Sequence, residues 1–308
     1  MKRSLCWSSP PVNALLFLLL SLPWLSCSGR KTAFTYLPPK TESRNNAAEL
    51  KKLAEEAWQR RGKTAAAEEA LQKYKAAYQA NPSDTAVAIR LSEAHFFVAE
   101  YVMVVKGVKS KEREKCYEQG LSAGERALEL HAGFRAVNRE TRDEEKALAQ
   151  LDGTWRAAVF WTYANMARWE DRQNPFRKVG NEQRLEIYRK RVHQLDDEFY
   201  YGGVYRISGI IDKGNTVDEV RYESAYEKAL AIAPDFFSNH RVFAVKYARP
   251  KKQFDLYNEH LNRIASGDPK GVPENMYEQE IAAALLKEEQ QKQEAKEEKP
   301  KREFKPRY

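Results

Sequence analysis

The chain has 308 residues, of which 42% are hydrophobic and 31% are charged, and its net charge is +8. This is the composition of a soluble, helix-rich protein that is long enough to bury a sizeable core. The positive charge does not indicate a nucleic-acid partner, because basic and acidic residues alternate along most of the chain and only Lys299–Tyr308 is strongly basic.

The N-terminus has the pattern of an export signal. Met1-Lys2-Arg3 is positively charged, and Ala14–Leu25 is an apolar run too short to span a bilayer as a stable helix. The pattern predicts a signal peptide over residues 1–26 and a chain that leaves the cytoplasm. No other stretch of the sequence is apolar enough to cross a membrane.

Cysteine placement adds a second prediction about the N-terminus. Cys27 follows Leu25-Ser26, where bacterial lipoprotein signal peptidase leaves a cysteine as the first mature residue. We therefore expect lipidation at Cys27, which would hold the protein on a membrane surface; the alternative is ordinary cleavage near Ser28. Residues 27–46 are polar, contain a Pro-Pro break and predict a tether. Cys116 is the single cysteine of the body, which predicts a small buried apolar residue and no disulfide within the chain.

From Ala47 onward, the apolar residues are spaced as in helices, and this part of the sequence contains an irregular repeat. Four segments resemble the second helix of a tetratricopeptide unit, in which small residues let a neighbouring helix approach and an aromatic fills the space between them. Ala70, Tyr74 and Ala77 form the first example. The segments close at positions 82, 132, 197 and 234, which are 50, 65 and 37 residues apart. These separations exceed the usual period of about 34 residues, so the units carry longer helices or insertions.

The sequence therefore predicts an all-α fold, a right-handed superhelix of irregular tetratricopeptide-like helical hairpins with extra terminal helices. Its expected divisions are a helical domain over residues 47–270 and a charged C-terminal helix and tail over residues 271–308. The alternative is an ordinary helical domain with Ala-rich packing faces. Thr154–Trp169 is apolar nearly all round, which predicts an inner helix buried on two sides.

The segment Asp196–Ile211, "DDEFYYGGVYRISGII", places two glycines among aromatic residues. Glycines at a helix end suit a left-handed cap and a sharp reversal of the chain. The aromatic rings either fill the core at this corner or line a ligand cavity. Four rings within seven residues are more than a corner needs, so we expect at least two of them to face a cavity.

Motifs for catalysis and metal binding are missing from the sequence. There is no nucleophile elbow, phosphate-binding loop or dinucleotide fingerprint, and the five histidines lack zinc-site spacing. We therefore expect no enzyme activity, no cofactor and no metal, and an apolar cavity with a few polar groups as the only site class. His240 and Arg241 are candidate polar groups; the alternative, which their place at a helix start favours, is that both face water.

Several segments in succession resemble a known family. These are "ALELHAGFR", a Trp-rich helix, "DDEFYYGGVYRISGI" and "YEKALAIAPDFFSNHRVFAVKYARPKKQFDLYNEHLNRI". From about Ala65 to Ile264 the chain is similar to the T-component (TatT-type) lipoproteins of tripartite ATP-independent periplasmic (TRAP) transporters. The resemblance implies an exported lipoprotein on the periplasmic side of a bacterial membrane and a homotrimer. It also implies a channel or pocket in each subunit for hydrophobic ligands such as lipids or organic acids, and a TRAP-type substrate-binding protein as partner.

We therefore expect a ligand-binding or ligand-passing accessory component of a TRAP-type transport system. The alternative is a scaffold lipoprotein that binds a partner's peptide segment in a concave groove. The expected ligand-binding residues are mainly aromatic side chains of the inner helices, with Arg206, His240 and Arg241 as polar groups. They are Trp155, Trp161, Tyr200, Tyr201, Tyr205, Arg206, His240 and Arg241.

Overall fold

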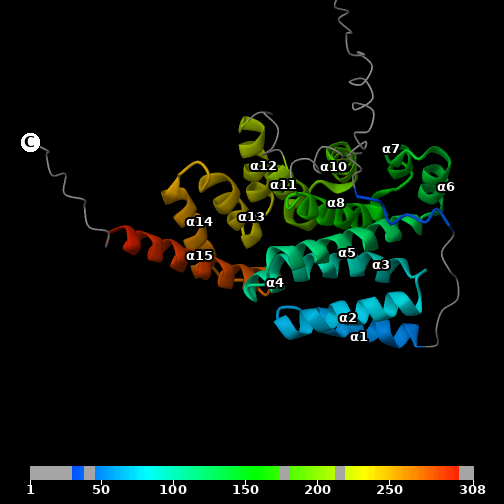
Figure 1. Cartoon of the computed structure of the whole chain (residues 1–308), viewed down its shortest axis with the longest axis horizontal. Coiled ribbons are helices and arrows are strands. Elements are labelled where there is room, and N and C mark those ends of the chain that lie inside the picture. Colours follow the sequence, from blue (N-terminus) through cyan, green and yellow to red (C-terminus); the bar gives the residue numbers. More distant parts are fainter. Residues whose placement is uncertain (1–29, 38–45, 174–180, 212–218, 298–308) are drawn as a thin grey trace, which may run out of the picture.

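The computed structural model describes residues 30–37, 46–173, 181–211 and 219–297, and over these ranges the chain forms helices and no strand (Figure 1). The predicted all-α class is therefore confirmed. No helix in these ranges is both long and apolar enough to cross a membrane. The expected signal peptide, the expected lipidation site Cys27 and the basic segment 299–308 lie outside the described residues.

The first part of the chain forms a stack of long helices at the bottom and centre of Figure 1. Each helix packs on the next: α1 on α2, α2 on α3, and α3 on α5. A π-helical segment, η2, extends α3 into the short α4 without a break in helical backbone. The bounds are α1 Ala47–Gln59, α2 Thr64–Ala80, α3 Thr85–Phe97, η2 Val98–Val102, α4 Met103–Val105 and α5 Ser110–Glu129.

The middle of the chain adds two further helix pairs above α5. The central helix α8 packs on α3 and α5 on one side and on α10 and α11 on the other, and α11 packs on α12. The bounds are α6 Ala132–Thr141, α7 Glu144–Leu148, the 3₁₀ turn η3 Gly153–Trp155, α8 Arg156–Glu170, α10 Glu182–Asp196, α11 Phe199–Ile211 and α12 Glu219–Ile232.

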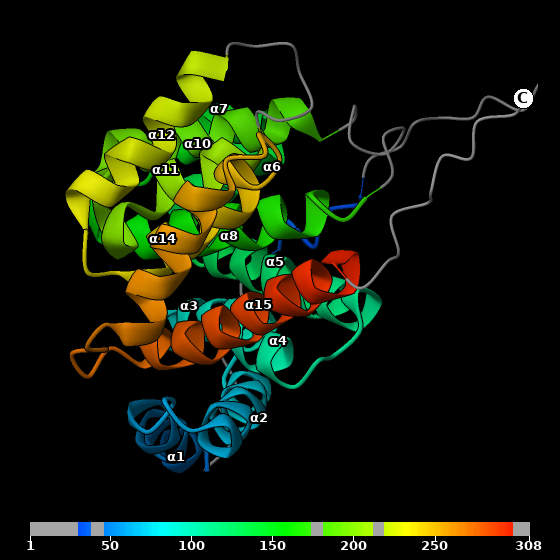
Figure 2. The same ribbon diagram turned by 90° about the vertical axis from the view of Figure 1, so that its left-hand side faces the viewer.

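The last helices bring the C-terminal part of the chain back to the first part. The long α15 packs against α13 and α14 and also against η2 and α4, and Figure 2 shows it beside α4. Its buried residues include Tyr277, whose hydroxyl donates to the backbone oxygen of Arg61 between α1 and α2 at 2.9 Å. The bounds are α13 Phe237–Val242, the π-helical η5 Phe243–Ala248, α14 Phe254–Ser266 and α15 Pro273–Glu297.

Each of the four repeat-like segments lies in one helix: α2, α5, α10 or α12. The aromatic Tyr74 of α2 and Tyr226 of α12 are buried, as their spacing predicts. On α5, a Cβ atom placed at Gly124 would lie 2.4 Å from the hydroxyl oxygen of Thr162 on α8. The small residue therefore allows the two helices to come closer than any other side chain would permit.

Helix α8 confirms the prediction for an inner helix. Every residue from Ala158 to Glu170 is buried, on all sides of the helix. Because α8 has neighbours on both sides, an apolar residue is favourable at almost every position, and each large buried side chain contributes about 1.5–3 kcal/mol.

Part of the expected tether is docked on the body. Phe34 packs on Phe134 of α6, and the Arg30 guanidinium pairs with Glu125 of α5 at 2.8 Å. The backbone N–H groups of residues 33, 35 and 36 donate to Glu125 and to Glu129, also on α5. The backbone N–H groups of this extended segment donate to buried carboxylates, as they would to the carbonyls of a neighbouring strand. These hydrogen bonds hold residues 30–37 on the body.

Candidate ligand-binding site at the α11 corner

The chain enters α11 through a left-handed turn at Tyr200, Tyr201 and Gly202, whose φ angles are 51°, 61° and 68°. The predicted left-handed corner is therefore present, but two tyrosines share it and Gly203 does not. A left-handed conformation costs roughly 1–2 kcal/mol for a residue with a side chain. Gly203 serves close packing instead, since a Cβ atom there would lie 2.5 Å from the Phe160 ring.

The rings of the turn belong to a contiguous aromatic cluster. The Tyr200 ring meets Trp161 of α8 edge to face, with ring centroids 4.6 Å apart. The Tyr201 ring stacks on Phe236, just before α13, at 4.1 Å and an interplanar angle of 13°. Phe236 is buried, whereas Tyr201 is 41% exposed. The turn thus covers the interior with one ring on the surface and others below it.

Arg206 lies beneath these rings and is only 2% exposed. Its guanidinium is 5.4 Å from the centroid of the Tyr200 ring and 5.0 Å from that of Phe236. Nη1 donates to Oδ1 of Asn239 at 2.8 Å, and Nη2 has no hydrogen-bond partner. No carboxylate of the described residues lies within ion-pair distance, and burial lowers the pKa of this guanidinium below its usual value.

We call the corner residues Tyr200, Tyr201, Arg206 and Phe236 the Arg206 corner. Beside it lies the Glu100 cluster, which we define as Glu100 of η2, Arg168 of α8, Arg241 of α13 and Glu278 of α15. These two groups differ in how their charges are paired.

In the Glu100 cluster every charge has an opposite partner. Glu100 accepts from Arg168 and from Arg241, both at 2.8 Å, and from the Tyr117 hydroxyl at 2.6 Å. Arg241 also pairs with Glu278 at 2.5 Å. Burial alone would raise the pKa of Glu100, but Arg168 and Arg241 hold it well below its usual range.

Hydroxyl groups connect the cluster to the corner. The Tyr101 hydroxyl lies 3.0 Å from the Ser238 hydroxyl, which donates to Glu278, and 3.4 Å from the Tyr200 hydroxyl. The Tyr200 hydroxyl donates to Glu274 of α15 at 3.2 Å. The position of the Tyr200 ring is therefore fixed by helices from both ends of the chain.

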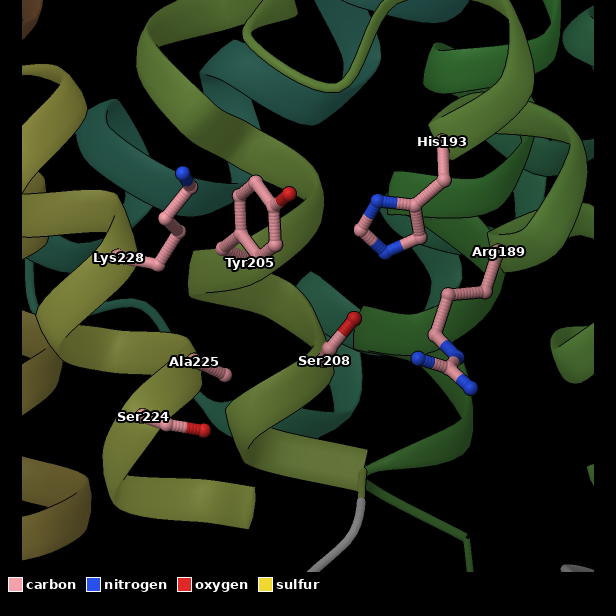
Figure 3. Close-up of a pocket in the computed structure, with 7 residues that line it drawn as sticks. All are labelled: Arg189, His193, Tyr205, Ser208, Ser224, Ala225 and Lys228. Atoms are coloured by element: carbon pink, nitrogen blue, oxygen red, sulfur yellow. The ribbon is translucent and has the colours of Figure 1, made fainter.

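A pocket of about 320 Å³ lies along a different side of α11 (Figure 3). Figure 3 shows His193 and Arg189 on α10 facing Tyr205 and Ser208 on α11, with Lys228 on α12 beside the Tyr205 ring. Ser224 and Ala225 complete the lining from α12. Tyr205 is thus an aromatic residue of the corner that does border a cavity.

Basic side chains lie around a pocket whose lining is otherwise mostly apolar. Arg189 is paired with Glu186 on its own helix, whereas the Lys228 ammonium has no carboxylate of the described residues within ion-pair distance. Burial, followed by the nearby Arg189, lowers the pKa of His193, which keeps its imidazole neutral. Burial and a hydrogen bond of 2.5 Å to Asp197 raise the pKa of Tyr205 to about 12, so its hydroxyl stays protonated.

The remaining expected site residues lie elsewhere. Trp155 is half-buried and packs against His131, with ring centroids 5.1 Å apart. His240 is buried, and its Nε2 donates to the oxygen of Pro234 while its Nδ1 lies 2.8 Å from Nδ1 of His260. Arg241 is in the Glu100 cluster. The alternative that His240 and Arg241 face water is wrong, because α14 and α15 cover α13.

The single body cysteine is not arranged as a nucleophile. Cys116 is buried and lies 3.4 Å from Nδ1 of His95. Burial raises the pKa of the thiol to about 12 and lowers that of His95 to about 3. Both shifts oppose the thiolate and imidazolium that an activated pair needs. The prediction of a small buried residue is confirmed.

Sequence reasoning missed four residues that shape the site: Phe236, Asn239, Lys228 and Glu278. Phe236 and Asn239 belong to a segment that we quoted for its resemblance, but their contacts with α11 depend on how α13 packs. Asn239 donates to three backbone oxygens, those of Tyr201, Ala229 and Ala233, and so holds the turn to α12. Lys228 and Glu278 stand in charged stretches where nothing in the spacing distinguishes them from surface residues.

The fold and site define an all-helical protein with a charged, aromatic interior. Among the described residues, no group of three or more His, Cys, Asp or Glu side chains could hold a metal ion. The family model described as TRAP transporter T-component matches residues 94–292, from α3 to α15 and more than half of the chain. The chain belongs to this family, which consists of transport accessory proteins and is not an enzyme family. No curated protein matches the sequence.

Proposed function

We propose that this T-component is exported and binds a small acid-bearing molecule in the pocket between α10, α11 and α12, which it exchanges with the substrate-binding protein of its TRAP system. The observation that carries the proposal is the pocket lining. Its seven residues include no acidic side chain, and the ammonium of Lys228 has no carboxylate of the described residues within ion-pair distance. Of the two ligand classes that the resemblance suggests, this lining favours an organic acid over a purely apolar molecule.

Lys228 is the residue that we expect to contact the acid group. Its ammonium has three N–H donors, and a charge-assisted hydrogen bond to a carboxylate is about twice as strong as a neutral one. Ser208 and Ser224 lie in the same lining. The Tyr205 ring would pack on the carbon skeleton of the ligand.

The resemblance supports further parts of the proposal. The helix pairs α1–α2, α3–α5, α8–α10 and α11–α12 each combine one repeat-like helix with its predecessor, which supports a tetratricopeptide-like superhelix. We also propose a lipid anchor at Cys27, periplasmic location and a trimer. The docking of residues 30–37 on α5 and α6 would keep such an anchor close to this part of the body.

The binding experiment compares the purified protein with a pocket variant and a matched control. Mass spectrometry of released small molecules identifies a co-purifying acid, and titration calorimetry with that acid, or with succinate as a first probe, measures its affinity. Lys228→Ala should weaken binding at least about tenfold, because a hydrogen bond to a charged group contributes about 1.5–3 kcal/mol. Lys190→Ala, on the exposed surface of α10, is the control.

Equal affinity in the two variants would contradict the pocket assignment. A protein that carries no small molecule and binds only peptides would instead support the scaffold function.

A further inference from the structure

Two arginines are buried among the described residues, Arg168 and Arg206, and only Arg168 has a carboxylate partner. Arg168 and Arg241 share Glu100 and Glu278, and Arg61 lies 3.7 Å from Glu274. Arg206 is as deeply buried as these residues and has only the amide oxygen of Asn239 and two aromatic faces. A buried charge without an opposite partner is unfavourable, and an apolar side chain of similar length would cost less at this place.

We infer that Arg206 is the receptor for the carboxylate of a ligand with an apolar body, which is admitted when the turn at Tyr200–Gly202 lifts. This site is separate from the proposed pocket, because Arg206 contacts Phe236 and Asn239 whereas Tyr205 and Ser208 face α10 and α12. The inference therefore stands or falls independently of ligand binding in the pocket.

Arg206 lies close beneath the surface despite its burial. Its guanidinium packs on Phe236, Phe236 stacks on Tyr201, and Tyr201 is exposed to solvent. Displacing this stack would open a direct route from water to the unpartnered Nη2. Tyr201 is one of four large hydrophobic residues that are exposed among the described residues, so the cover itself is weakly anchored on its outer side.

The cover is also connected to Arg206 through Asn239. The amide oxygen of Asn239 accepts from Arg206, and its nitrogen donates to the backbone oxygen of Tyr201 at 3.2 Å. A carboxylate that takes over Nη1 and Nη2 replaces the amide oxygen and weakens the hold of Asn239 on the turn. The left-handed backbone of Tyr200 and Tyr201 is strained, and opening of the turn would release this strain. Ligand binding and opening of the turn therefore favour each other.

The surroundings of Arg206 indicate which ligand it would take. The planar guanidinium offers two parallel N–H donors, which match the two oxygens of a carboxylate. The rings of Tyr200 and Phe236 lie against the guanidinium, and both would contact an alkyl or aryl group. A medium-chain or aromatic monocarboxylate has both parts, whereas a small dicarboxylate lacks the apolar one.

The test uses octanoate as the probe, with octanol and acetate as probes that lack the acid group or the apolar body. We expect octanoate to bind the full chain in titration calorimetry and to raise its unfolding temperature, and both control probes to bind at least tenfold more weakly. Arg206→Met should lose at least tenfold in octanoate affinity while unfolding at or above the wild-type temperature. Lys228→Ala should keep the octanoate affinity, which separates this site from the pocket.

Octanoate affinity that is the same in wild type and Arg206→Met, or absent from the wild type, would overturn the inference. If this variant does not fold, Arg206→Lys decides: it keeps the charge but loses the planar fork, so unchanged affinity overturns the inference and a tenfold loss supports it.

Discussion

The Glu100 cluster and the Arg206 corner are neighbours in the same interior, and both bury guanidinium groups. In the first, Arg168 and Arg241 meet carboxylates and the Tyr117 hydroxyl completes the network. In the second, Arg206 meets an amide oxygen and aromatic rings. The charges of the Glu100 cluster form ion pairs between helices, whereas Arg206 has a donor without a partner, which we propose is used by a ligand. The first should matter for folding and the second for binding.

The largest expected effect tests the structural half of this comparison. Glu100→Gln removes the carboxylate between Arg168 and Arg241 while keeping the shape of the side chain. Breaking a buried ion pair from one side costs about 3–5 kcal/mol, since the partner charges stay buried. Urea denaturation followed by circular dichroism should show this loss in the free energy of unfolding. A loss below about 1 kcal/mol would mean that the network does not hold the helices together.

A smaller loss is expected from overpacking the Arg206 corner. Gly203→Ala places a Cβ atom 2.5 Å from the Phe160 ring and 3.4 Å from Nη2 of Arg206. Such overpacking typically costs about 1–3 kcal/mol. The same denaturation experiment measures it, and Gly153→Ala, where a Cβ atom meets no other atom within 4 Å, is the control. Equal stability of the two variants would show that the corner has more room than its contacts indicate.

A substitution in the left-handed turn should lower the free energy of unfolding by less than Gly203→Ala does. Gly202→Ala keeps φ at 68° but adds a Cβ atom 3.2 Å from Ile232, at a cost of roughly 1–2 kcal/mol for the left-handed backbone. If the turn is the cover that we infer, this variant should also bind octanoate more tightly, because it destabilises the closed turn. Calorimetry on the same protein checks this sign, and weaker binding would speak against a moving cover.

The last prediction concerns the pH dependence that the paired histidines His240 and His260 confer. Burial, then His240 and Arg263, lower the pKa of His260 to about 4, against about 6.5 in an unfolded chain. A lowered histidine pKa contributes stability above pH 6.5, which is lost as the pH falls from about 6.5 towards 4. The unfolding temperature should therefore drop over this range, and His260→Gln should show a smaller drop than the wild type. An equal drop would assign the acid sensitivity to other groups, such as His95.

The helices and the left-handed corner can be predicted from the sequence. Periodicity identifies the helices that carry Tyr74, Tyr226 and the buried face of α8, because contacts between residues three or four apart repeat with the helix itself. The glycine pair predicts a left-handed corner, since glycine adopts that backbone without strain. The succession of segments around it identifies the family.

The partners of the buried charges follow only from the tertiary structure. Glu100 and Arg241 are 141 residues apart, and they meet because α15 and α13 fold back onto the end of α3. Spacing predicts which face of a helix is apolar, but it does not predict which helix covers that face. For the same reason, spacing predicts neither the burial of His240 and Arg241 nor the missing partner of Arg206. The sequence determined the helices and the corner, and their packing decided which of its side chains are paired.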